Sequence, residues 1–155
     1  MVWQSRSPRR WRCTCVATIN FFLPMIPPTI TQQQHKIRII NGRPQIYDPP
    51  ELKAARYKFQ GVLTPHAPEM KITGPVRLLT KWIWPLDVDS EMMEKLDPTY
   101  FVWKDTKPDT DNLIKLFKDC MTAAGFWEDD CQVVSEITEK MYSFRPGIYV
   151  EVTEL

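Results

Sequence analysis

The chain has 155 residues, of which 43% are hydrophobic; this is enough for one domain with a real core and too little for two. Charged residues make up 25% and aromatic residues 12%, values that exclude a disordered or low-complexity chain. The formal charge is +1, but residues 1–15 hold four arginines, so the remainder carries 16 basic and 19 acidic groups. Bulk positive charge is thus excluded as a means of binding nucleic acid, and any such contact must come from a local basic patch.

Residues 1–16 form a basic N-terminal extension, which we separate from a single domain over residues 17–155. An apolar run over residues 16–26 follows the arginines and has some features of a secretory signal. Asn20 and Pro24 interrupt this run, however, no small-residue cleavage site follows it, and it is too short to span a bilayer. We therefore expect no membrane segment and interpret the extension as an over-long reading frame or a cloning remnant, with a functional basic arm as the alternative.

Cysteine and histidine give little support for disulfide or zinc chemistry. Four cysteines are too few for a disulfide-linked secreted scaffold, and the Cys13-Thr14-Cys15 spacing is not that of a zinc knuckle. His35 and His66 lie far apart in the sequence without a ligand pattern around them. We expect reduced thiols in a cytoplasmic protein.

The first half of the chain predicts a strand, a hairpin and a helix. Residues 21–26 read as an apolar strand. Residues 36–40 and 43–47 are extended runs on either side of Asn41-Gly42, the strongest short-range hairpin signal. A helix is predicted over residues 50–59, because proline suits its first turn, strong helix formers follow, and Gly61 is a stop signal.

Two further strands are predicted over residues 75–84 and 100–104, with a polar connection over residues 85–98. The connection has alternating carboxylates at residues 87–91, as calcium loops do. It lacks the glycine turn and the distal glutamate of such loops. A solvated turn or a helix cap is therefore the better interpretation.

An amphipathic helix is predicted between Pro108 and Gly125. Proline favours an extended Lys107 before the helix, and glycine is a natural C-cap. One face of this helix is apolar, and it comprises Leu113, Leu116, Phe117, Cys120, Met121 and Ala124. Together these elements predict one small α+β domain in which a mixed β-sheet packs against about two to three helices.

The start of this helix is rich in carboxylates. N-capping would explain one of Asp109 and Asp111, but two aspartates, with Lys115 one turn beyond Asp111, exceed what a cap requires. Residues 128–130, Glu-Asp-Asp, follow the helix, and a turn and a returning strand would bring them back beside its start. Converging carboxylates repel one another unless a hard divalent cation binds them. The spacing thus leaves two interpretations open, a helix cap and a Mg²⁺ or Mn²⁺ site.

Two runs of the sequence resemble the signature of the RusA family of Holliday-junction resolvases. They are Lys107-Pro-Asp109-Thr-Asp111-Asn112-Leu113-x-Lys115, followed by Asp119, and Gly125-Phe126-Trp127-x-Asp129-Asp130-x-Gln132-Val133-Val134. The similarity is close over residues 105–140 and weaker over the N-terminal hairpin and helix. It implies a RusA-like α+β fold and a homodimeric, metal-dependent endonuclease that cuts four-way DNA junctions in recombination and repair.

The resemblance also implies roles for single residues. The essential acids of the family map to Asp109, Asp111 and Asp130, and its important lysine maps to Lys115. We expect the three aspartates to bind Mg²⁺, with Mn²⁺ as a substitute and Asp129 as an occasional or outer ligand. Metal ions held by carboxylates acidify the attacking water and stabilise charge on the attacking and leaving oxygens of a phosphodiester.

Lys115 would then point at the scissile phosphate or at the negative charge that develops there. Its ordinary role would be an ion pair with Asp111 or Asp119, which stabilises a helix by only a few tenths of a kcal/mol. The two roles are compatible, because a resting ion pair can release the lysine when phosphate arrives.

Dimerisation and DNA contact are further expectations. Two identical sites in a two-fold dimer match a two-fold four-way junction. The apolar residues 21–26 and 148–152 are candidate interface strands beyond the core that they must also fill. Local basic groups would contact phosphates, although each alone is more often a solvated surface charge. They are Lys107, Lys118, Arg38, Arg43, Lys53 and Arg56.

Tyr100, Phe101 and Trp103 lie just before the acidic motif and offer a stacking surface for bases at an opened junction. A strand normally directs alternate side chains into the core, so we expect core positions for these rings.

Substrate choice and origin stay open. The motif indicates phosphodiester hydrolysis, whereas selectivity for a junction depends on the shape of the dimer. Cleavage of flaps or fork structures, and a branched-DNA-binding protein without catalytic activity, are the alternatives. We expect a bacterial or phage-encoded protein.

Overall fold

The computed structural model describes residues 17–29, 36–47 and 49–155, except for the side chains of Lys36, Arg38, Gln45 and Ile46. The basic extension predicted over residues 1–16 lies outside the described residues.

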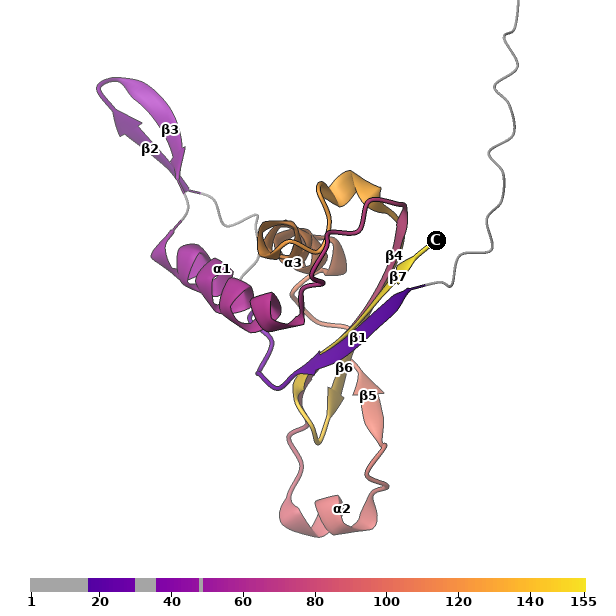
Figure 1. Ribbon diagram of the computed structural model, residues 1–155. Helices are drawn as coiled ribbons and strands as arrows, with labels where there is room; N and C mark the ends of the chain where they lie inside the picture. The colour runs from indigo at the N-terminus through magenta and orange to yellow at the C-terminus, as the bar shows by residue number, and fades with distance from the viewer. Residues whose placement is uncertain (1–16, 30–35, 48) are drawn as a thin grey trace, which may run out of the picture.

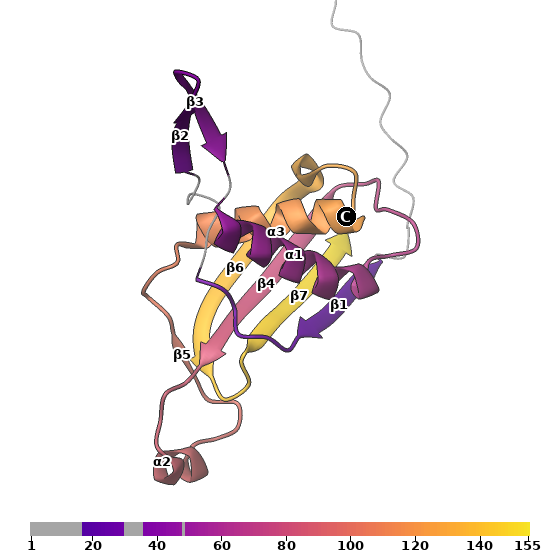
Figure 2. The same ribbon diagram turned by 90° about the vertical axis from the view of Figure 1, so that its left-hand side faces the viewer.

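A five-stranded mixed sheet forms the centre of the domain (Figures 1 and 2). Its strands, in spatial order, are β1 (Thr18–Leu23), β7 (Gly147–Glu154), β4 (Val76–Pro85), β6 (Val133–Ser143) and β5 (Phe101–Trp103). β4 and β6 are parallel, and the other neighbouring pairs are antiparallel. The predicted α+β fold with a mixed sheet is confirmed.

Helices α1 (Pro50–Leu63) and α3 (Thr110–Ala124) cover one face of the sheet (Figure 2). Three aromatic rings join these layers: Phe59 of α1, Trp82 of β4 and Phe117 of α3 lie in edge-to-face contact, with ring centroids 5.2 to 6.1 Å apart. All three side chains are buried, and such rings contribute more than their buried area. In the described part of the chain, no helix covers the opposite face of the sheet.

The predicted hairpin is confirmed as β2 (Lys36–Ile40) and β3 (Arg43–Tyr47). Asn41 and Gly42 have φ angles of 50° and 74°, the left-handed conformation that the two turn residues of a tight hairpin require. This two-stranded sheet stands apart from the main sheet, beyond the start of α1 (Figure 1).

The first strand is displaced from the predicted residues 21–26. β1 begins at Thr18 and ends at Leu23, where its pairing with β7 also ends at Ile148. Pro24 has no N–H group to donate to a strand ladder, and the Met25 amide turns back to the Leu23 carbonyl at 2.9 Å. The apolar residues therefore continue to residue 26, but the hydrogen-bonded ladder between β1 and β7 ends at Leu23.

The expected core role of residues 148–152 is confirmed, and their role as an interface strand stays a prediction. Ile148, Val150 and Val152 are fully buried beneath the helices of their own chain. Their side chains therefore belong to the core.

Gly61 does not end the first helix as predicted, because α1 continues to Leu63 and leads into a short 3₁₀ helix, η2 (Thr64–His66). Leu63 is fully buried, and burial of a leucine contributes about 1.5–3 kcal/mol, more than the cost of about 1 kcal/mol for glycine in a helix. Packing therefore outweighs the local preference.

The polar connection after β4 contains the short helix α2 (Ser90–Lys95). Asp89 caps this helix, since its side chain accepts a hydrogen bond from the Met92 amide at 2.8 Å. The helix-cap interpretation of these carboxylates is confirmed for Asp89. The connection projects from the end of the sheet opposite the hairpin (Figures 1 and 2).

The prediction that the rings of residues 100–103 enter the core is wrong. Tyr100, Phe101 and Trp103 are 41%, 43% and 58% exposed. β5 is a three-residue edge strand that pairs only with the end of β6, beyond the part of the sheet that the helices cover. Phe101 and Trp103 lie edge to face, with ring centroids 4.9 Å apart, on the surface.

Among the described residues, no helix is long and apolar enough to cross a membrane.

The exposed glycine in α1 provides a test of its helix. A Cβ added at Gly61 would meet no described atom within 4 Å, so Gly61→Ala should raise the free energy of unfolding by about 0.5–1 kcal/mol. Ala54→Gly, at another exposed position of α1, should lower it by a similar amount. Urea denaturation of both variants checks this, and a loss of stability in Gly61→Ala would contradict it.

Candidate active site

The first acidic segment lies at the start of α3. Asp109 is the N-cap residue, with the extended backbone that a cap requires, yet its side chain forms no capping hydrogen bond. Asp111 lies in the first turn and is exposed, as Asp109 is. The hydrogen bond of the N-capping interpretation is therefore absent at Asp109, although both carboxylates lie at the positive end of the helix dipole, as that interpretation expects.

Lys115 lies one helical turn after Asp111 on the same exposed face of α3. Within the described part of the chain, it forms no ion pair with Asp111 or Asp119. Lys115 is exposed, so its ammonium group is available to an anionic ligand on the face of α3 that carries Asp111.

The C-terminal end of α3 is defined by Gly125, which has a φ angle of 93°. The Gly125 amide donates to the Thr122 carbonyl and the Phe126 amide to the Met121 carbonyl, both at 3.1 Å, which is the Schellman arrangement. Trp127 follows, fully buried, and its indole N–H donates to the Thr122 hydroxyl at 2.7 Å. The Gly-Phe-Trp run therefore sets the direction of the chain that enters the second acidic segment.

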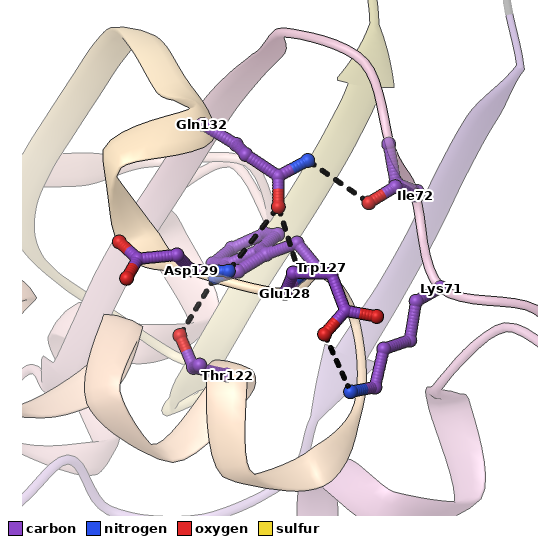
Figure 3. Close-up of polar contacts among 7 residues, drawn as sticks. All are labelled: Lys71, Ile72, Thr122, Trp127, Glu128, Asp129 and Gln132. Atoms are coloured by element: carbon purple, nitrogen blue, oxygen red, sulfur yellow. Dashed lines mark hydrogen bonds and ion pairs between the residues drawn. The ribbon is translucent and has the colours of Figure 1, made fainter.

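The second acidic segment is held by Gln132 (Figure 3). The Gln132 Oε1 accepts from the amides of Glu128 and Asp129 at 2.8 and 3.2 Å. Its Nε2 donates to the carbonyls of Ile72 and Gly74, both at 3.0 Å. One side chain thus satisfies four backbone groups and joins the acidic segment to the irregular segment that precedes β4.

Asp129 and Asp130 have different surroundings within this segment. Asp129 caps the 3₁₀ helix η3 (Asp130–Gln132) by accepting from the Cys131 amide at 2.9 Å. This hydrogen bond lowers the pKa of the Asp129 carboxyl below its usual value, since it favours the charged form. Asp129 therefore has a structural role, whereas the Asp130 carboxylate is not part of this cap.

The two acidic segments lie beyond opposite ends of α3. This helix has 15 residues, which corresponds to about 22 Å at 1.5 Å per residue. Over the described residues, no three acidic, histidine or cysteine side chains lie close enough to hold a metal ion. The expectation that the returning strand brings Asp130 back to Asp109 and Asp111 of the same chain is therefore wrong.

The predicted DNA-binding residues divide into two groups. Lys118 is engaged with Glu136 at 2.7 Å and Arg56 with Asp119 at 3.8 Å. Lys107, Lys53 and Arg43 are exposed. Arg38 belongs to β2, but its side chain lies outside the described part.

A family model described as endodeoxyribonuclease RusA matches residues 26–153, most of the chain. The chain belongs to the RusA family. It is 28% identical over 138 residues to a protein of Lactococcus phage r1t named crossover junction endodeoxyribonuclease rusA, covering 88% of this chain and 96% of that protein. It is also 33% identical over 135 residues to the uncharacterised protein YqaN of Bacillus subtilis (strain 168), covering 81% of this chain and 90% of that protein.

Sequence reasoning assigned no role to two residues of this RusA-family site. Gln132 belongs to the second signature run, residues 125–134, but its four backbone partners become known only from the tertiary structure. Lys140 lies in β6 and donates to carbonyl oxygens of the segment that precedes Asp109. The sequence does hold one indication of this role: Lys140 is a charged residue on the face of a strand that the helices cover, and a charge there needs polar partners.

Gln132→Ala should destabilise the RusA-family fold by about 1–3 kcal/mol, because four backbone groups lose their partner and water replaces only some of these bonds. Gln60→Ala, at a half-buried position of α1 away from the acidic segments, should change stability by less than about 0.5 kcal/mol. Chemical denaturation measures both. Equal losses in the two variants would show that Gln132 does not hold the acidic segment.

Proposed function

We propose that this RusA-family protein is a metal-dependent endonuclease that resolves four-way DNA junctions by paired phosphodiester hydrolysis. The observation that carries the proposal is the first turn of α3, where Asp109 and Asp111 are exposed beside Lys115, with no described protein group bound to either carboxylate. The relative from Lactococcus phage r1t, named as a crossover junction endodeoxyribonuclease, supports the choice of substrate.

A divalent cation fits the donor chemistry at this turn. Carboxylate oxygens are the ligands that Mg²⁺ and Mn²⁺ prefer, and two carboxylates two residues apart are free to turn toward one ion. When bound, such an ion activates water and stabilises the leaving oxygen. The single chain supplies two of the three proposed ligands at this place, because Asp130 lies beyond the other end of α3.

A second copy of the chain would supply the missing carboxylate. If a two-fold axis crosses the exposed side of α3, each copy presents Asp109 and Asp111 at one end and Asp130 at the other. The symmetry then pairs opposite ends and produces two identical composite sites. Two such sites match the two symmetric cuts that resolution of a junction requires.

DNA contact would come from exposed groups near these sites. Lys115 would neutralise the scissile phosphate, and Lys107 would hold the backbone next to it. Phe101 and Trp103 are exposed six to eight residues before Asp109. Aromatic rings that stack on unpaired bases favour branched DNA over a continuous duplex.

Asp111→Asn should remove cleavage of a synthetic four-way junction in Mg²⁺ or Mn²⁺ while leaving the fold intact. The expected loss exceeds about 100-fold, the upper end of what loss of an outer partner of a metal site costs. Asp87→Asn, an exposed carboxylate in the β4 to β5 connection, is the control and should cut normally. End-labelled junctions, linear duplex and flaps are compared with and without EDTA.

Other outcomes of this assay select the alternatives. Equal or faster cleavage of flaps would indicate a different branched substrate. Junction binding without cleavage in either metal would indicate a DNA-binding protein without catalytic activity, and the acidic turn would then have no catalytic role.

The composite site predicts complementation between two inactive variants. Asp111→Asn mixed with Asp130→Asn should regain nicking, because a mixed dimer contains one composite site made only of wild-type ligands. Random exchange of subunits makes roughly half of the dimers mixed, and each should nick the junction once.

Asp111→Asn mixed with Asp109→Asn is the control, since both changes affect the same end of α3 and no intact site can form. Differently tagged copies verify the exchange of subunits. If exchange occurs and neither mixture cuts, the ligands do not come from two copies.

A further inference from the structure

Lys140 connects the central sheet to the segment that carries Asp109. Its Nζ donates to the carbonyl oxygens of Thr106 at 2.8 Å and Pro108 at 2.7 Å. The Pro108 carbonyl belongs to the peptide that enters Asp109. The orientation of this peptide determines the direction in which the Asp109 side chain leaves the backbone.

The position of Lys140 in the sheet is unusual for a lysine. In the parallel register it lies beside the fully buried Trp82, on the face that the helices cover. Lys81, by contrast, lies on the opposite face of the sheet. There its ammonium group forms an ion pair with Glu139 at 3.4 Å. Among the described residues, the polar contacts of the Lys140 ammonium group are two carbonyls and no carboxylate.

A second lysine holds the same segment from its other end. Lys104 donates to the Tyr142 hydroxyl at 2.9 Å and to the Thr106 hydroxyl, and its ammonium group lies 4.9 Å from the centre of the Tyr142 ring. The Lys104 amide donates to the Lys140 carbonyl at 3.0 Å. The segment from residue 104 to residue 108 is therefore attached to β6 at several points, of which Lys140 is nearest to Asp109.

We infer that Lys140 is a positioning residue, which orients the Pro108–Asp109 peptide and thereby aims the Asp109 carboxylate at the site that it shares with Asp111. The inference rests on the proposed function for its consequence, cation binding at that site, but the effect on the backbone is independent of it. Asp109 has no capping hydrogen bond that would fix its orientation locally. The hydrogen bond from Lys140 of β6 to the Pro108 carbonyl fixes this peptide instead.

Lys140→Met tests this role, since methionine keeps an unbranched apolar stem and removes the charge and the donors. Mn²⁺ binding, followed by electron paramagnetic resonance in the full chain, should weaken by about 10-fold or more, as for other groups that orient a metal ligand. Amide hydrogen exchange at Leu113, whose N–H donates to the Asp109 carbonyl at 3.1 Å, should accelerate by a similar factor. Junction binding in EDTA should be unchanged.

Lys81→Met is the matched control, because it removes a strand lysine from the opposite face and should alter none of these values. Lys140→Arg keeps the charge and the hydrogen-bond donors and should retain most of the Mn²⁺ affinity of the wild type. It also provides the test if Lys140→Met does not fold. Unchanged Mn²⁺ affinity and unchanged exchange in a folded Lys140→Met would overturn the inference.

The wild-type protein offers a test without substitution. Nitrogen-detected NMR of the lysine ammonium groups should show slower proton exchange for Lys140 than for Lys81, because both carbonyl bonds must open first. Equal exchange at the two lysines would overturn the inference. If the wild type binds no Mn²⁺ and cuts no junction, the proposed function fails, and the exchange data alone decide the role of Lys140.

Discussion

The parallel pairing of β4 with β6 is the constraint on which the remaining structure depends. Parallel neighbours cannot be joined by a tight turn, so the chain must return along the full length of the sheet before β6 begins. α3 makes this return and runs opposite to β6. Its length therefore separates Asp109 and Asp111 from Asp130, and β6 then carries Lys140 back toward the start of α3.

β6 consequently holds both acidic segments. Gln132, the residue immediately before β6, satisfies backbone groups of the segment with Asp129 and Asp130. Lys140, farther along, satisfies carbonyls of the segment that leads to Asp109. In one place a side chain next to β6, and in the other a side chain within β6, supplies partners for irregular backbone, which is how a rigid scaffold positions functional loops.

Two aspartates occupy the same local position and have different roles. Asp129 and Asp109 are both N-cap residues, but only Asp129 caps with its side chain, and that bond lowers the pKa of its carboxyl. The cap uses the Oδ1 atom of Asp129, whereas neither oxygen of Asp109 accepts a capping hydrogen bond. Asp109 is accordingly a proposed direct ligand, and Asp129 stays a predicted outer or occasional one.

The sequence alone determined the locally encoded features: the Asn41-Gly42 hairpin, the limits of α3 at Asp109 and Gly125, the mixed α+β class and the family. The hairpin and the limits of α3 follow from backbone preferences and periodicity within a few residues. The family was indicated by the resemblance of residues 107–115 and 125–134 to its signature. Tertiary structure decided the rest. Burial of Leu63 carried α1 past Gly61, the edge position of β5 exposed Trp103, and the length of α3 separated the acids. These outcomes depend on contacts between residues that are distant in the sequence, and so do the partners of Gln132 and Lys140. Patterns within a few residues carry no information on such contacts.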